Sequence, residues 1–500
     1  MNPTNSKVTF AEKVGYSLGD GSANLVFQMM MIYQTKFYTD VFGLEGAIAG
    51  TVMLIARIVD AFVDPTAGLL SDRTRTRWGK YRPWVLWTAL PFMVFYVLAF
   101  YNPGIEDKSL VALYATASYV LLMVMYSFNN TPYSSLGGVM TSDIKERNSI
   151  TSIRFVTATI AQFVVQGLTL PLVSKFAGET GDKGHGWLCT ISIYAAIGFL
   201  FLVIAFLSAK ERISPPPSQK TDLKSDVRNV FSSVPWRAMF ILTLFLFTTL
   251  AMWGSAMNFY FENYVDRSAL YSFLDRLGLV VEEGASGTWQ SVLSAFGLVL
   301  TGPEKAYEVG FGVFCMLGAL IQFFGVILLS TFLADRFGKR DTFIVCLSLT
   351  AVFTALFYFP RPTDIGTIFL LNVCKSLAYA PTVPLLWAMI ADVADHSEYV
   401  NRRRATGFTF AGVVFALKAG LGIGGAILGF ILSGFGYVSG AGLSQTPRAV
   451  SGIVLSSSVI PALTFAVGVA ALFFYPITKT FNQKMQAELA ERRKEDREKL

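Results

Sequence analysis

The chain has 500 residues, of which 53% are hydrophobic and 15% are charged, whereas soluble domains typically carry about 25% charged residues. This composition excludes a soluble globular protein and predicts a polytopic membrane protein. The formal net charge of +7 does not indicate nucleic-acid binding, because the basic residues cluster in short loops between apolar stretches. The four cysteines and two histidines lack the paired spacing of zinc, redox or disulfide motifs, so we expect no cofactor and no structural metal.

Apolar stretches of about 20 residues, long enough to cross roughly 30 Å of hydrocarbon as helices, predict twelve membrane spans. They cover residues 12–39, 46–71, 84–102, 110–140, 154–176, 188–209, 238–264, 307–334, 342–360, 364–391, 406–437 and 449–476. The expected fold class is an all-α membrane protein. Residues 1–13 lack the apolar core of a cleavable signal peptide, so the first span is expected to stay in the mature protein.

Lysine and arginine crowd alternate loops between the predicted spans. These residues are Arg73, Arg75, Arg77, Lys80, Arg82, Lys145, Arg147, Arg336, Lys339, Arg340, Arg402, Arg403 and Arg404. Basic loops stay on the cytoplasmic side of a membrane, so we expect both termini to be cytoplasmic.

The longest cytoplasmic loop, residues 210–237, contains three consecutive prolines and mixed charges, which is typical of a linker. It divides the chain into an N-terminal half, residues 1–209, and a C-terminal half, residues 238–476. The charged residues 477–500 are expected to form a solvated cytoplasmic tail.

The C-terminal half contains an external insert at about residues 265–305 with two amphipathic segments. Glycines and charges interrupt both segments too often for either to span the bilayer. The insert either caps the outer surface of the C-terminal half or forms a lid over an outward opening.

The two halves repeat one another. GLLSDRTRTRWGKYRP, residues 68–83, follows the second span, and LADRFGKR, residues 333–340, follows the eighth. Pro132, Met140 and Asp143 have the same offsets as Pro381, Met389 and Asp392. Such six-helix repeats, with a substrate site between them, are a transporter architecture.

The paired Asp-Arg and Gly-Lys loops resemble the signature of the major facilitator superfamily. The resemblance implies alternating access, in which two pseudo-symmetric six-helix halves rock against each other. Asp72 and Arg73 in one loop, and Asp335 and Arg336 in the other, would then act as a cytoplasmic latch in the outward-open state.

A charged side chain in mid-membrane costs about 2.5–3.5 kcal/mol, so each one needs a role. The predicted spans contain Asp20, Arg57, Asp60, Asp64, Lys375 and Lys418. Arg57, Asp60 and Asp64 share one helix face, and one arginine cannot neutralise two carboxylates. The excess negative charge favours uptake of a monovalent cation or a proton.

Structural roles compete with these functional ones. Arg57, Asp60 and Asp64 could form an ion-pair knot that holds the bundle together. Asp20 could satisfy a helix-packing contact, and Lys418, on a face rich in small residues, needs an acidic partner or a cavity. Lys375 could extend its long side chain to the membrane interface.

A set of longer motifs resembles the glycoside-pentoside-hexuronide:cation symporters, the family of melibiose permease. The motifs are YSLGDG, RIVDAFVDPTAGLLSDRTRTRWGKYRPW, a Pro-Tyr-Ser-Ser-Leu segment in the fourth span, SIRF, ADVADHSEY and LKAG. They run over nearly the whole chain. The family implies sugar uptake driven by Na⁺, Li⁺ or H⁺ across the inner membrane of a bacterium, and we expect a monomer.

The resemblance also implies roles for single residues. Asp60 and Asp64 match the family's cation-binding carboxylates, and Ser127 falls at a hydroxyl cation ligand. Asp20 and Arg154 match residues that bind the sugar, and Lys418 matches a lysine that approaches the cation site and is assigned here to substrate binding.

Two positions depart from the family pattern. Asn130 stands where a carboxylate shared by cation and sugar would stand, and Ser134 replaces a sugar-stacking aromatic residue. Asn130 can still ligate a cation through its oxygen, but the lost charge weakens Na⁺ binding. The coupling ion therefore stays open between H⁺ and Na⁺, and melibiose itself becomes doubtful as the substrate.

Two other functions compete with sugar symport. A eukaryotic branch of the family moves lysophospholipid with Na⁺, but Gln162, Gln166 and Asn372 favour a hydrated cavity over a lipid cleft. A nutrient sensor would need a signalling domain, for which the central loop and tail are short. No phosphate loop, catalytic triad pattern or metal-ligand spacing supports an enzyme.

Overall fold

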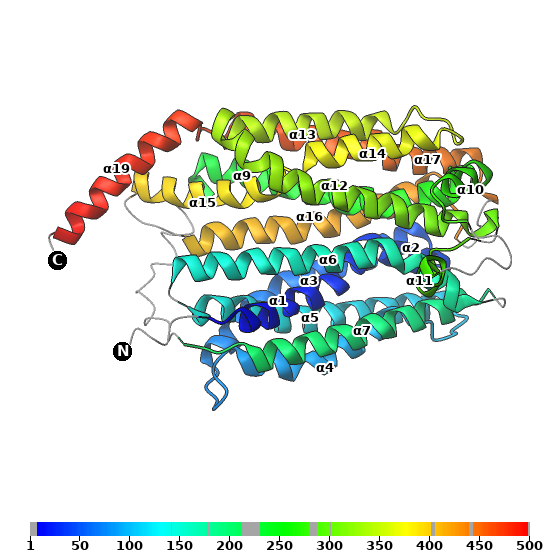
Figure 1. Ribbon diagram of the computed structural model, residues 1–500, viewed down its shortest axis with the longest axis horizontal. Coiled ribbons are helices and arrows are strands. Elements are labelled where there is room, and N and C mark those ends of the chain that lie inside the picture. The colour runs from blue at the N-terminus through cyan, green and yellow to red at the C-terminus, as the bar shows by residue number, and fades with distance from the viewer. Residues whose placement is uncertain are drawn as a thin grey trace.

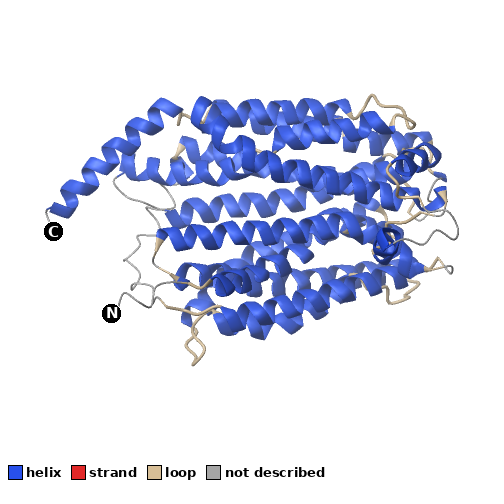
Figure 2. Ribbon diagram, viewed as in Figure 1, coloured by secondary structure: helices blue, strands red, loops and turns tan. Residues whose placement is uncertain are grey.

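The computed structural model is a bundle of helices (Figures 1 and 2). It describes residues 8–141, 143–178, 181–212, 231–280, 288–300, 302–401, 406–439 and 444–498. The first half contains α1 (Phe10–Ile32), α2 (Gln34–Asp40), α3 (Gly46–Arg73), α4 (Arg82–Ala99), α5 (Lys108–Met140), α6 (Ile144–Ala177) and α7 (Lys183–Ser208). Most of the predicted linker, residues 213–230, lies outside the described residues.

The second half continues the helical bundle. It contains α9 (Val234–Asn263), α10 (Arg267–Arg276), α11 (Thr288–Ala295), η2 (Pro303–Lys305), α12 (Ala306–Phe337), α13 (Lys339–Leu356), α14 (Ile365–Tyr379), α15 (Thr382–Asn401), α16 (Thr406–Gly434), α17 (Pro447–Ser457), α18 (Val459–Phe473) and α19 (Lys479–Glu498). Helix α19 extends from the bundle as the charged tail (Figure 1).

The helices pack in two groups. Helices α1 and α3–α7 contact one another, and α9 and α12–α18 form the second group. Both chain termini lie at the same end of the bundle, which we call the terminal end, and α2, α10 and α11 lie at the opposite or far end (Figure 1). The groups meet chiefly through α3 with α16, α6 with α12, and α1 and α2 with α9.

Ten helical segments among the described residues are long and apolar enough to cross a membrane. The other two predicted spans correspond to α1–α2 and α13, which are helical but more polar overall. Helix α13 begins with Lys339, Arg340 and Asp341, and α1 contains Glu12, Lys13 and Asp20. The chain is thus a multi-pass all-α membrane protein, while the count of twelve spans stays a prediction.

Three predicted spans are interrupted. The first breaks at Tyr33 between α1 and α2, and the last breaks at Ser458 between α17 and α18. The tenth breaks at Ala380 and Pro381, where proline has no N–H to continue the helix ladder. Pro132, its counterpart in the repeat, lies inside the continuous helix α5. The two halves therefore differ in local backbone while sharing sequence landmarks.

Glycines let α16 approach α3 closely. A Cβ on Gly429 would lie 2.2 Å from the Gly46 carbonyl oxygen, and one on Gly422 would lie 2.7 Å from Cβ of Arg57. Small residues of this kind allow helix backbones to pack tightly in membranes. The close approach aligns the middle of α16, which carries Lys418, with the charged face of α3.

The predicted insert contacts both helix groups. Leu270 of α10 packs against Gly310 of α12 in the second group. At the C-terminal end of α11, Lys175 of α6 donates hydrogen bonds to the carbonyls of Ser294 and Ala295, at 3.0 and 2.9 Å. The insert is therefore not confined to the surface of the second group. It also contacts the first group at the far end.

Candidate functional site

Two carboxylates and two cations meet where α3 packs against α16. The Lys418 ammonium contacts Oδ2 of Asp64 and lies 2.9 Å from Oδ2 of Asp60. Arg57 lies farther away, with Nη1 3.9 Å from Oδ2 of Asp60. We call these four residues the ion group. Its charges balance in this state, because Lys418 supplies the second positive charge from the other helix group.

Burial differs sharply within the ion group. The Asp60 side chain is 0% exposed, while Asp64 is 26% and Lys418 is 15% exposed. Helix α5 supplies hydroxyl groups to both acids. Ser127 donates to Asp60 at 2.5 Å, and Thr131 donates to Asp64 at 3.4 Å. Oδ2 of Asp60 has an ion-pair contact but no aligned hydrogen bond, so this buried acid retains acceptor capacity.

A second pair of charges joins α1 to α6. Arg154 binds both carboxylate oxygens of Asp20, and its Nη2 lies 3.2 Å from Oδ1. Its guanidinium also lies over the rings of Tyr16 and Tyr133, 5.6 and 5.4 Å from their centroids. We call these four residues the polar group. Asp20 and Arg154 stay partly exposed, so an acceptor and a donor remain accessible side by side.

The two tyrosines fix the position of Asp20. The Tyr16 hydroxyl donates to the Tyr133 carbonyl at 2.9 Å, and the Tyr133 hydroxyl donates to the Tyr16 carbonyl at 2.8 Å. The backbone N–H of Asp20 donates to the Tyr133 hydroxyl at 3.1 Å. Gly19 makes room for this arrangement, since a Cβ there would lie 2.2 Å from the Tyr133 ring.

Helix α5 links the ion group to the polar group. Ser127 and Thr131 contact the carboxylates of α3, and Tyr133, two residues farther on, contacts Asp20. Tyr126 on the same helix lies within electrostatic reach of Asp20, Asp60 and Asp64. A displacement of α5 would therefore change the contacts of both groups.

Three other residues considered in the sequence analysis, Asn130, Lys375 and Asn372, lie outside the ion group and the polar group. Asn130 is half-buried on α5, between the ligands named above, and its role stays a prediction. Lys375 is buried with its ammonium over the Trp253 ring and does not extend to the membrane interface. Asn372 donates to the Phe314 carbonyl at 2.7 Å and is buried in a helix contact, so it does not support a hydrated cavity.

The proposed latch residues do not meet in this state. Asp72 pairs with Lys80 at 2.8 Å in its own loop, and Lys479 donates to the carbonyl of Asp335 at 2.6 Å. Burial disfavours the Lys80 ammonium, but its contact with Asp72 outweighs this effect and raises the pKa of Lys80. Each loop is thus held within its own half of the chain.

Gly79 determines the geometry of the loop between α3 and α4. The Glu211 carboxylate accepts the backbone N–H groups of Lys80, Tyr81 and Arg82, at 2.7 to 3.0 Å, and so caps helix α4. Gly79 has φ of +115°, and a Cβ there would lie 2.6 Å from the Glu211 carboxyl. The positive φ and the close carboxylate both require glycine.

Replacing Gly79 with Ala is therefore expected to destabilise the protein by roughly 1–3 kcal/mol through strain and loss of the cap. The measurement is thermal unfolding of the purified protein in detergent. Gly104→Ala is the matched control, because Gly104 has φ of +67° but no neighbour within 4 Å. Equal losses in the two variants would contradict a role for the Glu211 contact.

Several contact residues escaped the sequence analysis. Tyr16 and Tyr133 lie in the YSLGDG and Pro-Tyr-Ser-Ser-Leu motifs but were assigned no role, and Thr131 lies one helical turn after Ser127. Lys36 and Glu262, near the ends of predicted spans, form a buried ion pair between α2 and α9. The i,i+4 spacing of Lys36 and Asp40 was the sequence pattern that could have indicated an ion pair here.

Comparison with known proteins gives the family. A model described as MFS/sugar transport protein matches residues 15–323 and 298–479. The chain is 32% identical over 475 residues to the inner membrane symporter YicJ of Escherichia coli, covering 95% of this chain and 93% of that protein. It is 31% identical over 487 residues to the isoprimeverose transporter of Lactiplantibacillus pentosus, covering 97% and 92%.

Solved structures agree in fold. The crystal structure of a D-xylose-proton symporter has a TM-score of 0.57 and 14% identity, covering 94% of this chain and 96% of that one. The two-group bundle accordingly has the major facilitator architecture. The chain belongs to the MFS/sugar transport protein family and is a membrane transporter.

Proposed function

We propose that the protein is a symporter that imports a sugar or glycoside together with a monovalent cation, H⁺ or Na⁺. The observation that carries this proposal is the shared helix α5, which contacts the carboxylates of the ion group and the Asp20–Arg154 pair of the polar group. Among the relatives, the name of YicJ supports symport, and that of the isoprimeverose transporter supports a sugar or glycoside as the substrate.

The cation binds at Asp60 and Asp64, helped by the oxygens of Ser127 and Thr131. Hard cations prefer such oxygen ligands, and either carboxylate can instead accept a proton. Lys418 now lies against both acids, so a cation must displace its ammonium. Because Lys418 belongs to the other helix group, cation binding changes a contact between the halves. Lys418 thus acts through the cation site rather than through the sugar.

The sugar binds at the polar group. The carboxylate of Asp20 accepts sugar hydroxyls and the guanidinium of Arg154 donates to them, with Asn130 as a further partner on α5. The preformed Asp20–Arg154 pair keeps both charges balanced when no sugar is present. Coupling between the two groups is a reciprocal binding free energy of typically 1–3 kcal/mol.

We propose that the terminal end is cytoplasmic, because the basic loop with Arg73, Arg75 and Arg77 follows α3 there. Residues 1–209 and 238–476 act as the two rocking halves of a monomer in the inner membrane. The far end, where α2 meets α9 and α6 meets α12, is then the closed extracellular end. The loops with Asp72–Arg73 and Asp335–Arg336 meet only when the transporter opens outward.

External pH in de-energised cells that express the protein tests this function. A panel of α- and β-glycosides, pentosides and hexuronates is added with and without Na⁺. Alkalinisation on adding one compound identifies that substrate and H⁺ symport. No pH change combined with Na⁺-dependent uptake of the labelled sugar identifies Na⁺ symport. No pH change and no uptake of any labelled sugar, combined with Na⁺-dependent uptake of lysophospholipid, would contradict sugar transport.

Deleting the insert is expected to favour the outward-open state. Arg267 donates to the Glu304 carbonyl at 3.2 Å, so the two ends of the insert are close enough for a short Gly-Ser linker. The deletion removes the Lys175 bonds between the halves, each contributing about 0.5–1.5 kcal/mol, which shifts the equilibrium by about tenfold. External sugar affinity measures this shift, and unchanged affinity would assign the insert to a cap.

A further inference from the structure

The far end contains a second group of buried charges that the transport site does not use. Lys36 of α2 pairs with Asp40 on the same helix at 2.6 Å and with Glu262 of α9. Lys36 and Glu262 are each 4% exposed and Asp40 is 11% exposed. Glu262 belongs to the second half of the chain, whereas Lys36 and Asp40 belong to the first.

Aromatic side chains of the second half surround this charge cluster. The Tyr437 hydroxyl, just beyond α16, donates to Asp40 at 3.1 Å. The Lys36 ammonium also lies 5.2 Å from the ring centroid of Phe259 and 5.7 Å from that of Tyr307. The cluster thus connects α2 of the first half with α9, α12 and the end of α16 in the second.

The interface beside the charges is polar but incompletely paired. Ser255, Asn258 and Glu262 follow one face of α9, opposite the break between α1 and α2. Ser255 donates to the Met31 carbonyl at 2.7 Å. Both amide atoms of Asn258 and the Thr35 hydroxyl are buried without a hydrogen-bond partner. Unpaired buried groups favour separation of the surfaces, because water satisfies them once the interface opens.

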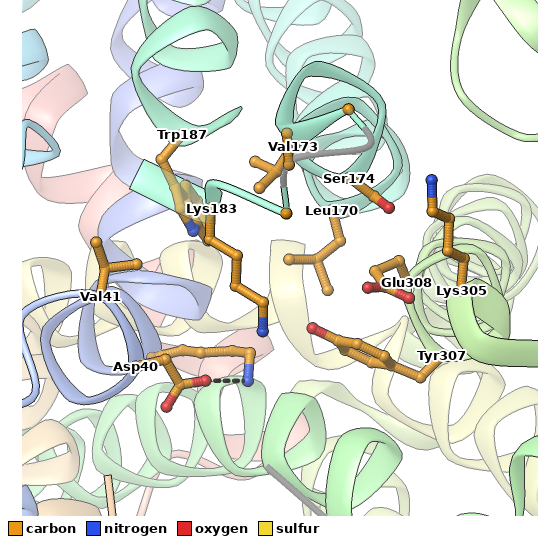
Figure 3. A pocket seen from close by; sticks show the side chains of 14 residues that line it. Asp40, Val41, Leu170, Val173, Ser174, Lys183, Trp187, Lys305, Tyr307 and Glu308 are labelled. Atoms are coloured by element: carbon orange, nitrogen blue, oxygen red, sulfur yellow. Dashed lines mark hydrogen bonds and ion pairs between the residues drawn. The ribbon is translucent and has the colours of Figure 1, made fainter. Parts of the chain in front are cut away.

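A cavity lies next to Lys36, which forms part of its lining (Figure 3). Its volume is about 170 Å³, enough for several water molecules, and its lining includes Lys36, Asp40, Trp187, Tyr307 and Glu308. The Lys36 ammonium donates to the Asp40 carboxylate at 2.6 Å. In Figure 3, Lys183 and Tyr307 lie beside Asp40. Water can therefore reach the ion pairs from the far end as the two halves separate.

We propose that the Lys36–Glu262 ion pair is the extracellular gate of the transporter. The pair forms when the far end closes and breaks when it opens, while Asp40 keeps the Lys36 ammonium paired in both states. Lys36 and Asp40 are four residues apart on one helix, so their contact survives separation of the halves. This inference rests on the proposed orientation, in which the far end is extracellular.

Sided thiol labelling tests the gate. Asn258→Cys is introduced into a variant whose four native cysteines are replaced by Ala, and a membrane-impermeant maleimide is added outside intact cells. Lys36→Gln leaves two buried carboxylates without their cation, so labelling is expected to accelerate on the order of 100-fold. Glu262→Gln leaves Lys36 with Asp40, so labelling is expected to accelerate by about tenfold at most.

Matched variants separate the possible outcomes. Lys183→Gln removes an exposed lysine at the same cavity and should leave the labelling rate unchanged. The double exchange Lys36→Glu with Glu262→Lys restores one cation between two acids and should return labelling to the starting rate. Equal rates in Lys36→Gln and Lys183→Gln, or no restoration by the double exchange, would overturn the gate. Labelling only in inside-out vesicles would instead overturn the proposed orientation.

Discussion

Replacing Asp60 with Asn is expected to abolish concentrative sugar uptake while leaving the protein in the membrane. Asp60 is the fully buried acid of the ion group and contacts Ser127 and Lys418. One cation moving through 100 mV supplies about 2.3 kcal/mol, which corresponds to roughly 50-fold accumulation of the sugar. Without the carboxylate this driving force is lost, and the accumulation ratio should fall to about one.

Uptake of labelled sugar into energised vesicles measures this ratio. Asp64→Asn should give the same loss, because Asp64 is the second acid that Lys418 contacts. Glu106→Gln is the matched control, since it neutralises an exposed acid between α4 and α5. Wild-type accumulation in Asp60→Asn or Asp64→Asn would remove these residues from cation coupling and favour the structural ion-pair knot.

Replacing Arg154 with Gln is expected to weaken sugar binding by roughly 10- to 100-fold, the loss of a charge-assisted hydrogen bond worth about 1.5–3 kcal/mol. The guanidinium holds Asp20 and lies over Tyr16 and Tyr133. Arg154→Lys keeps the charge but not the two-pronged geometry, so its affinity should fall between wild type and Arg154→Gln.

Sugar and cation affinities measured on the purified protein test this assignment. Cation binding to the ion group should persist in Arg154→Gln, because Asp60, Asp64 and Ser127 are untouched. Arg276→Gln, an exposed residue of α10, is the control for loss of an arginine. Unchanged sugar affinity in Arg154→Gln would place the sugar elsewhere, and loss of both affinities would indicate a folding defect.

Much of the fold could be predicted because membrane burial constrains sequence strongly. Long apolar stretches predicted the helices, and the break at Pro381 follows from its missing N–H. The break at Ser458 also has a local cause, because Pro461 has no N–H to bond to the Ser457 carbonyl four residues earlier. The break at Tyr33 could not be predicted, because no proline or glycine lies beside it.

The charged residues of the site were predictable because charge is rare in a membrane helix. Their partners were predictable only in part, because the family resemblance pointed to Lys418 and Ser127 near the cation site but not to Thr131 or Tyr133. The residues of the second span alone leave one carboxylate of the Asp60–Asp64 pair unbalanced, and in the structure Lys418 of the other half supplies the second positive charge. Thr131 and Tyr133 were assigned no role, because placing a hydroxyl side chain in a membrane helix costs little free energy and composition alone does not single these residues out. Lys36 and Glu262 escaped because charges near span ends are usually solvated.

Reciprocal coupling between the ion group and the polar group is what makes the protein a symporter in the proposed mechanism. The direct measurement is the sugar affinity of the purified transporter with and without the coupling cation, and the cation affinity with and without sugar. Each ligand is expected to increase the affinity for the other by the same factor, about 5- to 150-fold, and Asp60→Asn is expected to reduce this factor to about one. Equal sugar affinities with and without every cation tested would contradict this coupling.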